Sequence, residues 1–309
     1  MRKIVSGFVF GLIWLVSLLP LRVLYIISDI FFLLFLICPP LRYRRGVVRQ
    51  NLRASFPDRD RKWLRRTERR FYRHLCDLLV ESLKCCSMPM GVMSRRMRVV
   101  GLDMVQNLMD NGRSVVMYLG HLGNWEWISS LGAYSKPGQV AAQVYHPLEN
   151  KIMDDVMLRI RSQYGAVSIP MDKVLRRLME YNAGKKPFII GMIADQVPLW
   201  WAIHHWTEFL HQDTPVFNGT ERIARKLDTA VVYTDISRLG RGRYQMEFKM
   251  MTEHPRELPE NALTDLYFKM LEDNINREPE LWLWTHRRWK RTRKGYQQWL
   301  EQRGQDLKK

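Results

Sequence analysis

The chain is poor in cysteine and in acidic residues. Its 309 residues include four cysteines, Cys38, Cys76, Cys85 and Cys86. So few cysteines in so long a chain exclude a disulfide-stapled secreted fold and favour a reducing compartment. Aspartate and glutamate total 31 against 49 lysines and arginines, which gives a formal net charge of +18. This surplus indicates an anionic partner, such as nucleic acid, a phosphate-bearing membrane surface or an acidic carrier protein.

The sequence also lacks the patterns that hold most cofactors and metals. It contains no glycine-rich phosphate loop, no serine nucleophile elbow and no zinc-ligand spacing. His204, His205 and His211 lie close together in the chain, but no carboxylate or cysteine joins them at the spacing of a metal site. We therefore expect no metal and no cofactor.

Charge is absent from a long segment near the N-terminus. From Ile4 to Leu21 there are 18 residues without a charge. As a helix this run would be ~27 Å long, close to the ~30 Å hydrocarbon thickness of a bilayer. A signal peptide would also begin with a charged leader, but no small-residue cleavage site ends the run. A second apolar stretch, residues 23–38, follows directly and is interrupted by Asp29.

We expect residues 1–40 to form an N-terminal membrane anchor and residues 41–309 a catalytic domain. Residues 23–38 are either a return span or a helix in the interface. Five arginines lie between residues 42 and 53, and residues 59–73 add eight basic side chains against two acids. An arginine-rich flank of this kind stays cytoplasmic and attracts anionic headgroups, which predicts an anionic membrane surface as a partner. A solvated helix face is the simpler alternative.

Beyond Gly101, short apolar segments alternate with amphipathic ones. The pattern predicts strands at 114–119, 139–145, 188–194, 230–236 and 244–250. It predicts helices at 58–86, 124–134, 149–164, 171–182, 218–227 and 259–277. This alternation indicates an α/β fold with a largely parallel sheet flanked by helices, behind the membrane-anchoring helix. Ligands in such folds lie beyond the carboxyl ends of the strands.

A histidine and a glutamate follow the first of these strands, in Gly120-His121-Leu122-Gly123-Asn124-Trp125-Glu126. Residues five apart on one helix lie ~140° apart and cannot touch. The two side chains meet only if His121 lies in the loop before the helix, with Gly120 and Gly123 supplying flexibility. Glu126 would then orient the imidazole, whose other nitrogen takes a proton from a hydroxyl. Taken alone, such a histidine is also typical of a capping or packing residue.

The stretch is similar to the H-x₄-D/E motif of the glycerolipid acyltransferases. More narrowly, the chain resembles the late acyltransferases of lipid A biosynthesis over essentially its whole length. The segments that carry this resemblance, in chain order, are residues 44–52 with Phe56-Pro57, residues 121–126, Arg159-Ile160-Arg161-Ser162, Ala194-Asp195-Gln196 and residues 283–290.

The resemblance implies a glycerolipid-acyltransferase-like fold. It also implies that the catalytic domain lies on the cytoplasmic face of a bacterial inner membrane. It implies transfer of a fatty acyl chain from an acyl carrier protein thioester to a hydroxyl of a glucosamine-based lipid A precursor. His121 would be the general base and Glu126 its partner. The remaining motif residues would bind substrate; they are Asn124, Arg161, Asp195 and Gln196. Without the resemblance, Asp195 reads as a helix cap and Arg161 as a solvated helix residue.

Two departures from the family pattern leave the acceptor open. Tyr145-His146-Pro147 stands where the family usually has tyrosine-arginine-proline, and Val197 follows Asp195-Gln196 where the family often has glycine. Another membrane lipid, either an aminolipid or a lysophospholipid, is therefore the alternative acceptor. Nucleic-acid binding would suit the net charge and the Trp-rich basic segment 282–293, but it explains neither the anchor nor the ordered motifs. We expect no nucleic-acid partner.

Overall fold

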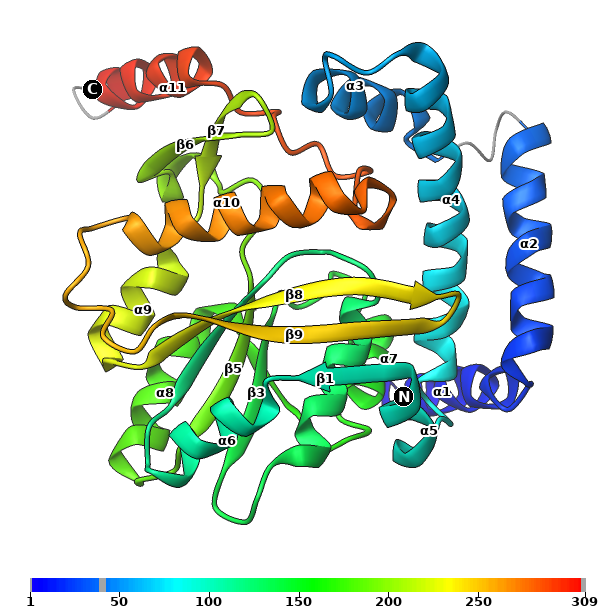
Figure 1. Ribbon diagram of the computed structural model, residues 1–309, viewed down its shortest axis with the longest axis horizontal. Coiled ribbons are helices and arrows are strands. Elements are labelled where there is room, and N and C mark those ends of the chain that lie inside the picture. The colour runs from blue at the N-terminus through cyan, green and yellow to red at the C-terminus, as the bar shows by residue number, and fades with distance from the viewer. Residues whose placement is uncertain (1, 39–42, 307–309) are drawn as a thin grey trace.

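The computed structural model of the chain describes residues 2–38 and 43–306 (Figure 1). The expected boundary after residue 40 lies outside these described residues. In chain order the helices and strands are α1 (Arg2–Ser17), α2 (Leu21–Ile37), α3 (Arg45–Ser55), α4 (Arg61–Lys84), α5 (Met90–Arg96), β1 (Met97–Val100), α6 (Leu102–Asp110), β2 (Val115–Leu119), η2 (Trp125–Tyr134), β3 (Val140–Tyr145), α7 (Lys151–Arg161), β4 (Val167–Pro170), η3 (Met171–Lys173), α8 (Val174–Ala183), β5 (Phe188–Ile193), η4 (Trp200–Ala202), β6 (His205–Phe209), β7 (Gln212–Val216), α9 (Gly219–Leu227), β8 (Ala230–Gly240), β9 (Arg243–Thr252), α10 (Ala262–Arg277), η5 (Pro279–Leu281) and α11 (Arg293–Asp306).

The main sheet has seven strands in the order β1-β9-β8-β2-β5-β3-β4. Strands β8, β2, β5, β3 and β4 run parallel to one another. Strand β9 is antiparallel to β8, and the edge strand β1 is parallel to β9. The predicted largely parallel α/β sheet is confirmed, and all five predicted strands are present as β2, β3, β5, β8 and β9.

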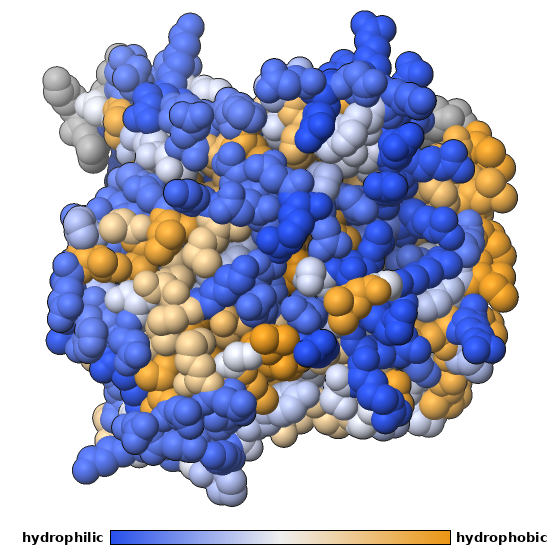
Figure 2. All heavy atoms as spheres, in the orientation of Figure 1, coloured by the Kyte–Doolittle hydropathy of each residue, from blue (hydrophilic) through white to orange (hydrophobic). Residues whose placement is uncertain are grey.

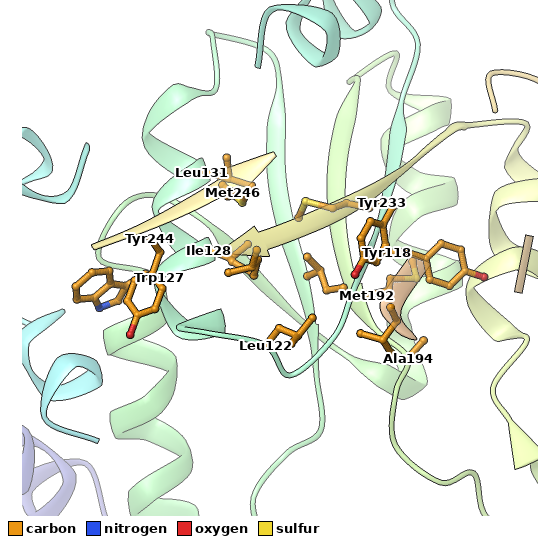
Figure 3. Packing of buried hydrophobic residues seen from close by; sticks show 14 of the residues in the cluster. Tyr118, Leu122, Trp127, Ile128, Leu131, Met192, Ala194, Tyr233, Tyr244 and Met246 are labelled. Carbon is orange, nitrogen blue, oxygen red and sulfur yellow. The ribbon is translucent and has the colours of Figure 1, made fainter. Parts of the chain in front are cut away.

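The core encloses the loop that follows β2. Every residue of β2 is buried, as expected for a central strand covered on both faces. Trp127 packs edge-on against Tyr244 with ring centroids 5.7 Å apart (Figure 3). Tyr118 stacks on Tyr267 of α10 with centroids 4.5 Å apart. Aromatic packing around this loop leaves little freedom for the residues between β2 and η2.

The predicted helix at 124–134 is instead the 3₁₀ helix η2. Within it, the Ser129 hydroxyl donates a hydrogen bond to the carbonyl of Glu126, and such bonds compete with regular helical ones. A Cβ on Gly132 would lie 2.3 Å from the backbone nitrogen of Ala166, so η2 packs directly against the backbone that precedes β4. This close approach requires glycine at position 132, and it brings the η2 backbone into contact with the loop between α7 and β4.

The apolar run from Ile4 to Leu21 is not one helix over its whole length, because α1 ends at Ser17 and α2 begins at Leu21. The axes of α1 and α2 bend by 104°. Pro20 stands at the bend and has no N–H with which to continue a helix. In residues 2–38 and 43–306, no single helix is long and apolar enough to cross a membrane, although α1 and α2 would pass that test together.

Helix α2 runs alongside α4 and presents two different faces (Figure 1). The inner face buries Leu24, Phe32 and Phe35. The outer face exposes large apolar side chains and forms the orange edge beside α2 in Figure 2; these residues are Ile26, Ile30, Phe31, Leu33, Leu34 and Ile37. We refer to these six residues as the apolar face of α2.

A charged cluster ties α2 to the sheet. Arg241, in the turn between β8 and β9, donates to both Asp29 of α2 and Asp77 of α4. The Asp77 carboxylate also accepts a 2.7 Å hydrogen bond from the Ser28 hydroxyl. The Asp77 side chain is 5% exposed and that of Arg241 is 30% exposed. Helix α2 is therefore integrated into the folded body.

We expect Arg241→Met to lower the free energy of unfolding by about 2–4 kcal/mol, because it leaves the buried Asp77 carboxylate without its cation. This range lies below that for a fully buried ion pair, because solvent screens the partly exposed Arg241 guanidinium. Chemical denaturation in detergent would measure the change. Arg243→Met on the same hairpin, at an exposed residue, is the matched control and should change stability little. Equal losses in both variants would show that the cluster does not hold α2.

Candidate functional site

Two adjacent parallel strands bring the central pair of the site together. Leu119 at the end of β2 is in register with Ile193 at the end of β5. His121 and Asp195 each lie two residues beyond these positions. Both side chains therefore meet at the carboxyl edge of the sheet, where ligands bind in folds of this class.

Asp195 holds His121 by two contacts. Its Oδ1 lies 2.6 Å from Nδ1 of His121, and its Oδ2 accepts from the backbone N–H of His121 at 2.7 Å. Oδ2 also accepts from Nε1 of Trp282 at 2.8 Å. Burial raises the pKa of Asp195, but the charge of His121 and these hydrogen bonds outweigh it and lower the pKa to about 2. An ionised Asp195 selects the tautomer of His121 with the proton on Nδ1, which leaves Nε2 as an acceptor.

The imidazole of His121 is partly accessible. The His121 side chain is 18% exposed, whereas Asp195 is almost fully buried. Nε2 of His121 lies 3.3 Å from the side-chain nitrogen of Gln196. Trp125 meets the imidazole edge-on, with ring centroids 5.2 Å apart. Nε2 therefore lies on the side of the imidazole opposite Asp195, next to Gln196.

The C-terminal segment holds the His121 loop from the other side. The carbonyl of His121 accepts from the backbone N–H of Leu283, and the N–H of Gly123 donates to the carbonyl of Leu281, both at 3.1 Å. Leu122 and Trp282 form an isolated antiparallel bridge between these contacts. Segments far apart in sequence therefore fix both backbone and side chain of His121.

The two glycines of the loop act differently. Gly123 has φ +55°, and a Cβ there would lie 2.7 Å from Ile236. Gly120 has no unusual φ, but a Cβ would lie 2.6 Å from Leu271 of α10. We expected both glycines to supply flexibility; Gly123 supplies a left-handed turn, and Gly120 supplies space.

The expected contact between Glu126 and His121 is replaced by two separate pairs. Glu126 accepts from Nε and Nη2 of Arg161 at 2.8 and 2.7 Å, in a bidentate ion pair. Asp195 occupies the position on His121 that we expected Glu126 to fill. The reason is geometric: η2 begins at Trp125, and the first-turn side chain of Glu126 reaches α7.

An apolar pocket lies between η2 and the sheet. Its polar lining includes Glu126 and Arg161, and Trp125 lines it beside the imidazole. The apolar lining comes from β2, β3, β5 and η2, and includes Met117, Leu119, Ile128, Leu131, Ala141, Ile189 and Ile193. The lining is that of a site for a largely apolar ligand.

Asn124 is buried and engaged within the protein. Its Oδ1 accepts from the N–H of Trp127 at 3.2 Å and caps η2, and its Nδ2 donates to Glu81 at 2.8 Å. These contacts position the loop. The direct substrate contact expected of Asn124 stays a prediction.

Glu81 is a residue of this region that the sequence reading missed. It is fully buried in α4 and accepts from the hydroxyls of Tyr25 and Tyr244 as well as from Asn124. Burial raises the pKa of Glu81 to about 7, against the lowering effect of these hydrogen bonds. The sequence does contain a sign of it: Glu81 lies one turn from Leu78, on the apolar face of the predicted helix 58–86. Glu81 thus connects α2 to the loop that carries His121.

Of the three histidines considered as metal ligands, His205 has a carboxylate partner. His205 pairs with Asp265 of α10 at 2.7 Å. Among the described residues, no three histidine, cysteine, aspartate or glutamate side chains come together in a way that would hold a metal ion.

The carboxyl edge of the parallel sheet thus carries a histidine paired with a buried aspartate, beside an apolar pocket. Residues 2–291 match the family of bacterial lipid A biosynthesis acyltransferases, and the chain belongs to this family. It is similar to a lipid A biosynthesis palmitoleoyltransferase of Escherichia coli (strain K12), with 25% identity over 94% of this chain and 92% of the relative. A lipid A biosynthesis acyltransferase of Shigella flexneri matches at the same identity and coverage.

Glu81→Gln tests the buried network through pH. The raised pKa of Glu81 means that the folded state favours its protonated form, so this stabilisation is present below the unfolded value near 4.5 and is lost as pH rises to about 7. We expect the stability of the wild type relative to Glu81→Gln to fall by about 3 kcal/mol across this window. Denaturation in detergent at several pH values measures it. Parallel profiles for the two proteins would contradict the assignment.

Proposed function

We propose that this enzyme transfers a fatty acyl chain from an acyl carrier protein thioester to a hydroxyl of a glucosamine-based lipid A precursor. The proposal rests on family membership and, above all, on the His121–Asp195 pair beside an apolar pocket. The acidic donor protein also suits a chain with a net charge of +18.

His121 acts as the general base in this proposal. Nε2 takes the proton of the acceptor hydroxyl while its oxygen attacks the thioester carbonyl carbon. The carbon–sulfur bond then breaks, and the leaving thiolate takes the proton back from Nε2. Asp195 stabilises the imidazolium that exists between these two proton transfers, as its short contact with Nδ1 allows. The side-chain amide of Gln196 donates to Nε2 at 3.3 Å, and the acceptor hydroxyl would take its place on the imidazole.

The acyl chain of the donor occupies the apolar pocket in our proposal. Trp125 lines the pocket and touches the imidazole, so a chain in the pocket brings its thioester toward His121. The Glu126–Arg161 pair holds η2 to α7 and thereby maintains the wall of the pocket. Glu126 is therefore a positioning residue in this account, through Arg161.

The enzyme would work at the cytoplasmic face of the bacterial inner membrane. The apolar face of α2 suits contact with lipid tails, and the arginines that follow suit anionic headgroups. Residues 1–40 would supply this attachment, with α1 and α2 lying against the folded body.

Mass spectrometry of total lipids from a strain lacking the gene tests the substrate. We expect a glucosamine-based lipid to lose one acyl chain and complementation to restore it. His121→Ala expressed at the same level should fail to restore it. Loss of a chain from an aminolipid or a phospholipid instead would contradict the proposed acceptor and favour the alternative.

Kinetics of single and double variants test the base. His121→Ala should lower kcat at least ~10²-fold, and Asp195→Asn nearly as far, because the wrong tautomer of His121 is then favoured. The double variant should be little worse than His121→Ala, since the two residues act as a unit. Independent, multiplying losses would contradict the pairing.

A graded series at Ala141 tests the pocket. Ala141 pairs with Ile189 in the sheet and lines the pocket. We expect Ala141→Val and then Ala141→Leu to shorten the longest acyl chain transferred at the wild-type rate, because each added carbon fills the pocket. Unchanged kcat/KM with short-chain donors is the internal control. An equal loss for donors of every length would show that the chain binds elsewhere.

A further inference from the structure

A basic groove of about 230 Å³ lies between α3 and α4, separate from the pocket beside His121. It is lined by Arg49, Leu52, Arg53, Arg61, Leu64, Arg65 and Glu68. We propose that this groove is a binding site for a phosphate group carried by a lipid. The site itself stands on the geometry below, and its identification with the acceptor rests on the proposed function.

The charges of the groove are unbalanced. Its one acid, Glu68, accepts from Arg45 at Oε1 and from Arg49 at Oε2. The side chains of Arg53, Arg61 and Arg65 make no hydrogen bond or ion pair within the described part of the chain. The groove therefore brings four arginines together against one carboxylate that is already engaged.

Such an arrangement favours an anion. Like charges held side by side repel each other, and a bound anion removes this cost. Arginine forks match the oxygens of phosphate bidentately, which a carboxylate-poor groove of this size accommodates. Arg49 and Arg53 are one turn apart on α3, and Arg61 and Arg65 are one turn apart on α4, so two pairs of forks face one hollow.

The neighbourhood indicates that the phosphate belongs to an amphiphile. Arg61, Arg65, Arg69 and Arg73 recur every four residues along α4 and lead from the groove to α2. The Arg69 guanidinium lies 5.9 Å from the ring centroid of Phe32. The carboxyl end of α2 lies at the same end of the molecule as α3, and its outer edge is apolar (Figures 1 and 2). A lipid phosphate in the groove would leave its tails near the apolar face of α2.

The groove is also connected to the site. Asn51 of α3 donates to the carbonyls of Trp284 and His286, both at 2.9 Å. Two residues before Trp284, the indole of Trp282 donates to Asp195. Helix α3 thus packs on the segment that holds the His121–Asp195 pair. A lipid whose phosphate binds in the groove would therefore lie next to this segment, as the acceptor in the proposed function must.

Binding measurements in detergent test the proposal without any acyl transfer. The probes are mixed micelles containing a bisphosphorylated tetraacyl diglucosamine lipid, the same lipid after removal of its phosphates, or phosphatidylglycerol. Detergent covers the apolar face of α2 equally in every sample. Arg61→Gln/Arg65→Gln should raise the Kd for the phosphorylated lipid about 10- to 30-fold, from ~1 kcal/mol for each arginine. Binding of the dephosphorylated lipid should not change.

The matched control is Arg222→Gln/Lys226→Gln on α9. It also removes two positive charges one turn apart, at exposed side chains remote from the groove. We expect less than about a twofold change in Kd for this variant. Unchanged thermal unfolding of both double variants would exclude misfolding, and Arg53→Gln provides a second, independent change within the groove.

The lipids distinguish two sources of the phosphate. A loss confined to the phosphorylated diglucosamine lipid supports an acceptor site, and an equal loss for phosphatidylglycerol supports a site for membrane headgroups. An unchanged Kd in the groove variants, or an equal loss in the α9 control, would overturn the proposal. Loss of acyl carrier protein binding with lipid binding intact would also overturn it, because the groove would then be a protein-docking surface.

Discussion

The site depends on the carboxylate of Asp195, because three parts of the chain meet on its two oxygens. It joins the end of β5 to the imidazole and backbone of His121 and to the indole of Trp282. A buried carboxylate is costly unless its hydrogen bonds are satisfied, and here each oxygen has a donor. The strand ends, the loop after β2 and the C-terminal segment are therefore held in one arrangement, with Nε2 of His121 on the side opposite Asp195.

A second set of buried polar contacts extends this order to the N-terminal helices. Glu81 joins Tyr25 of α2 to Asn124 in the His121 loop, and Arg241 joins Asp29 of α2 to Asp77 of α4. The division into an anchor at 1–40 and a domain at 41–309 stays a prediction. The contacts nevertheless make α2 part of the body that carries the site, so α2 and the loop that carries His121 are physically linked.

Local patterns predicted much of the fold, and the long-range pairings account for what they missed. Apolar runs identified β2 and β5, and the alternation of elements indicated the parallel sheet that places His121 beside Asp195. Glu126 was predicted as the partner of His121 from the resemblance to the H-x₄-D/E motif, in which the two residues are five positions apart. Asp195 is 74 residues away from His121, and the distance in space between two residues cannot be inferred from so long a separation in sequence. The break at Pro20 was underestimated, since proline also occurs within membrane helices.

The central claim is that Asp195, and not Glu126, orients His121. Nitrogen-15 NMR of the His121 imidazole in the detergent-solubilised protein tests it most directly, because the shifts of Nδ1 and Nε2 report which nitrogen carries the proton. We predict the Nδ1-protonated tautomer in the wild type and in Glu126→Gln, and its loss in Asp195→Asn. Loss of this tautomer in Glu126→Gln with retention in Asp195→Asn would contradict the account.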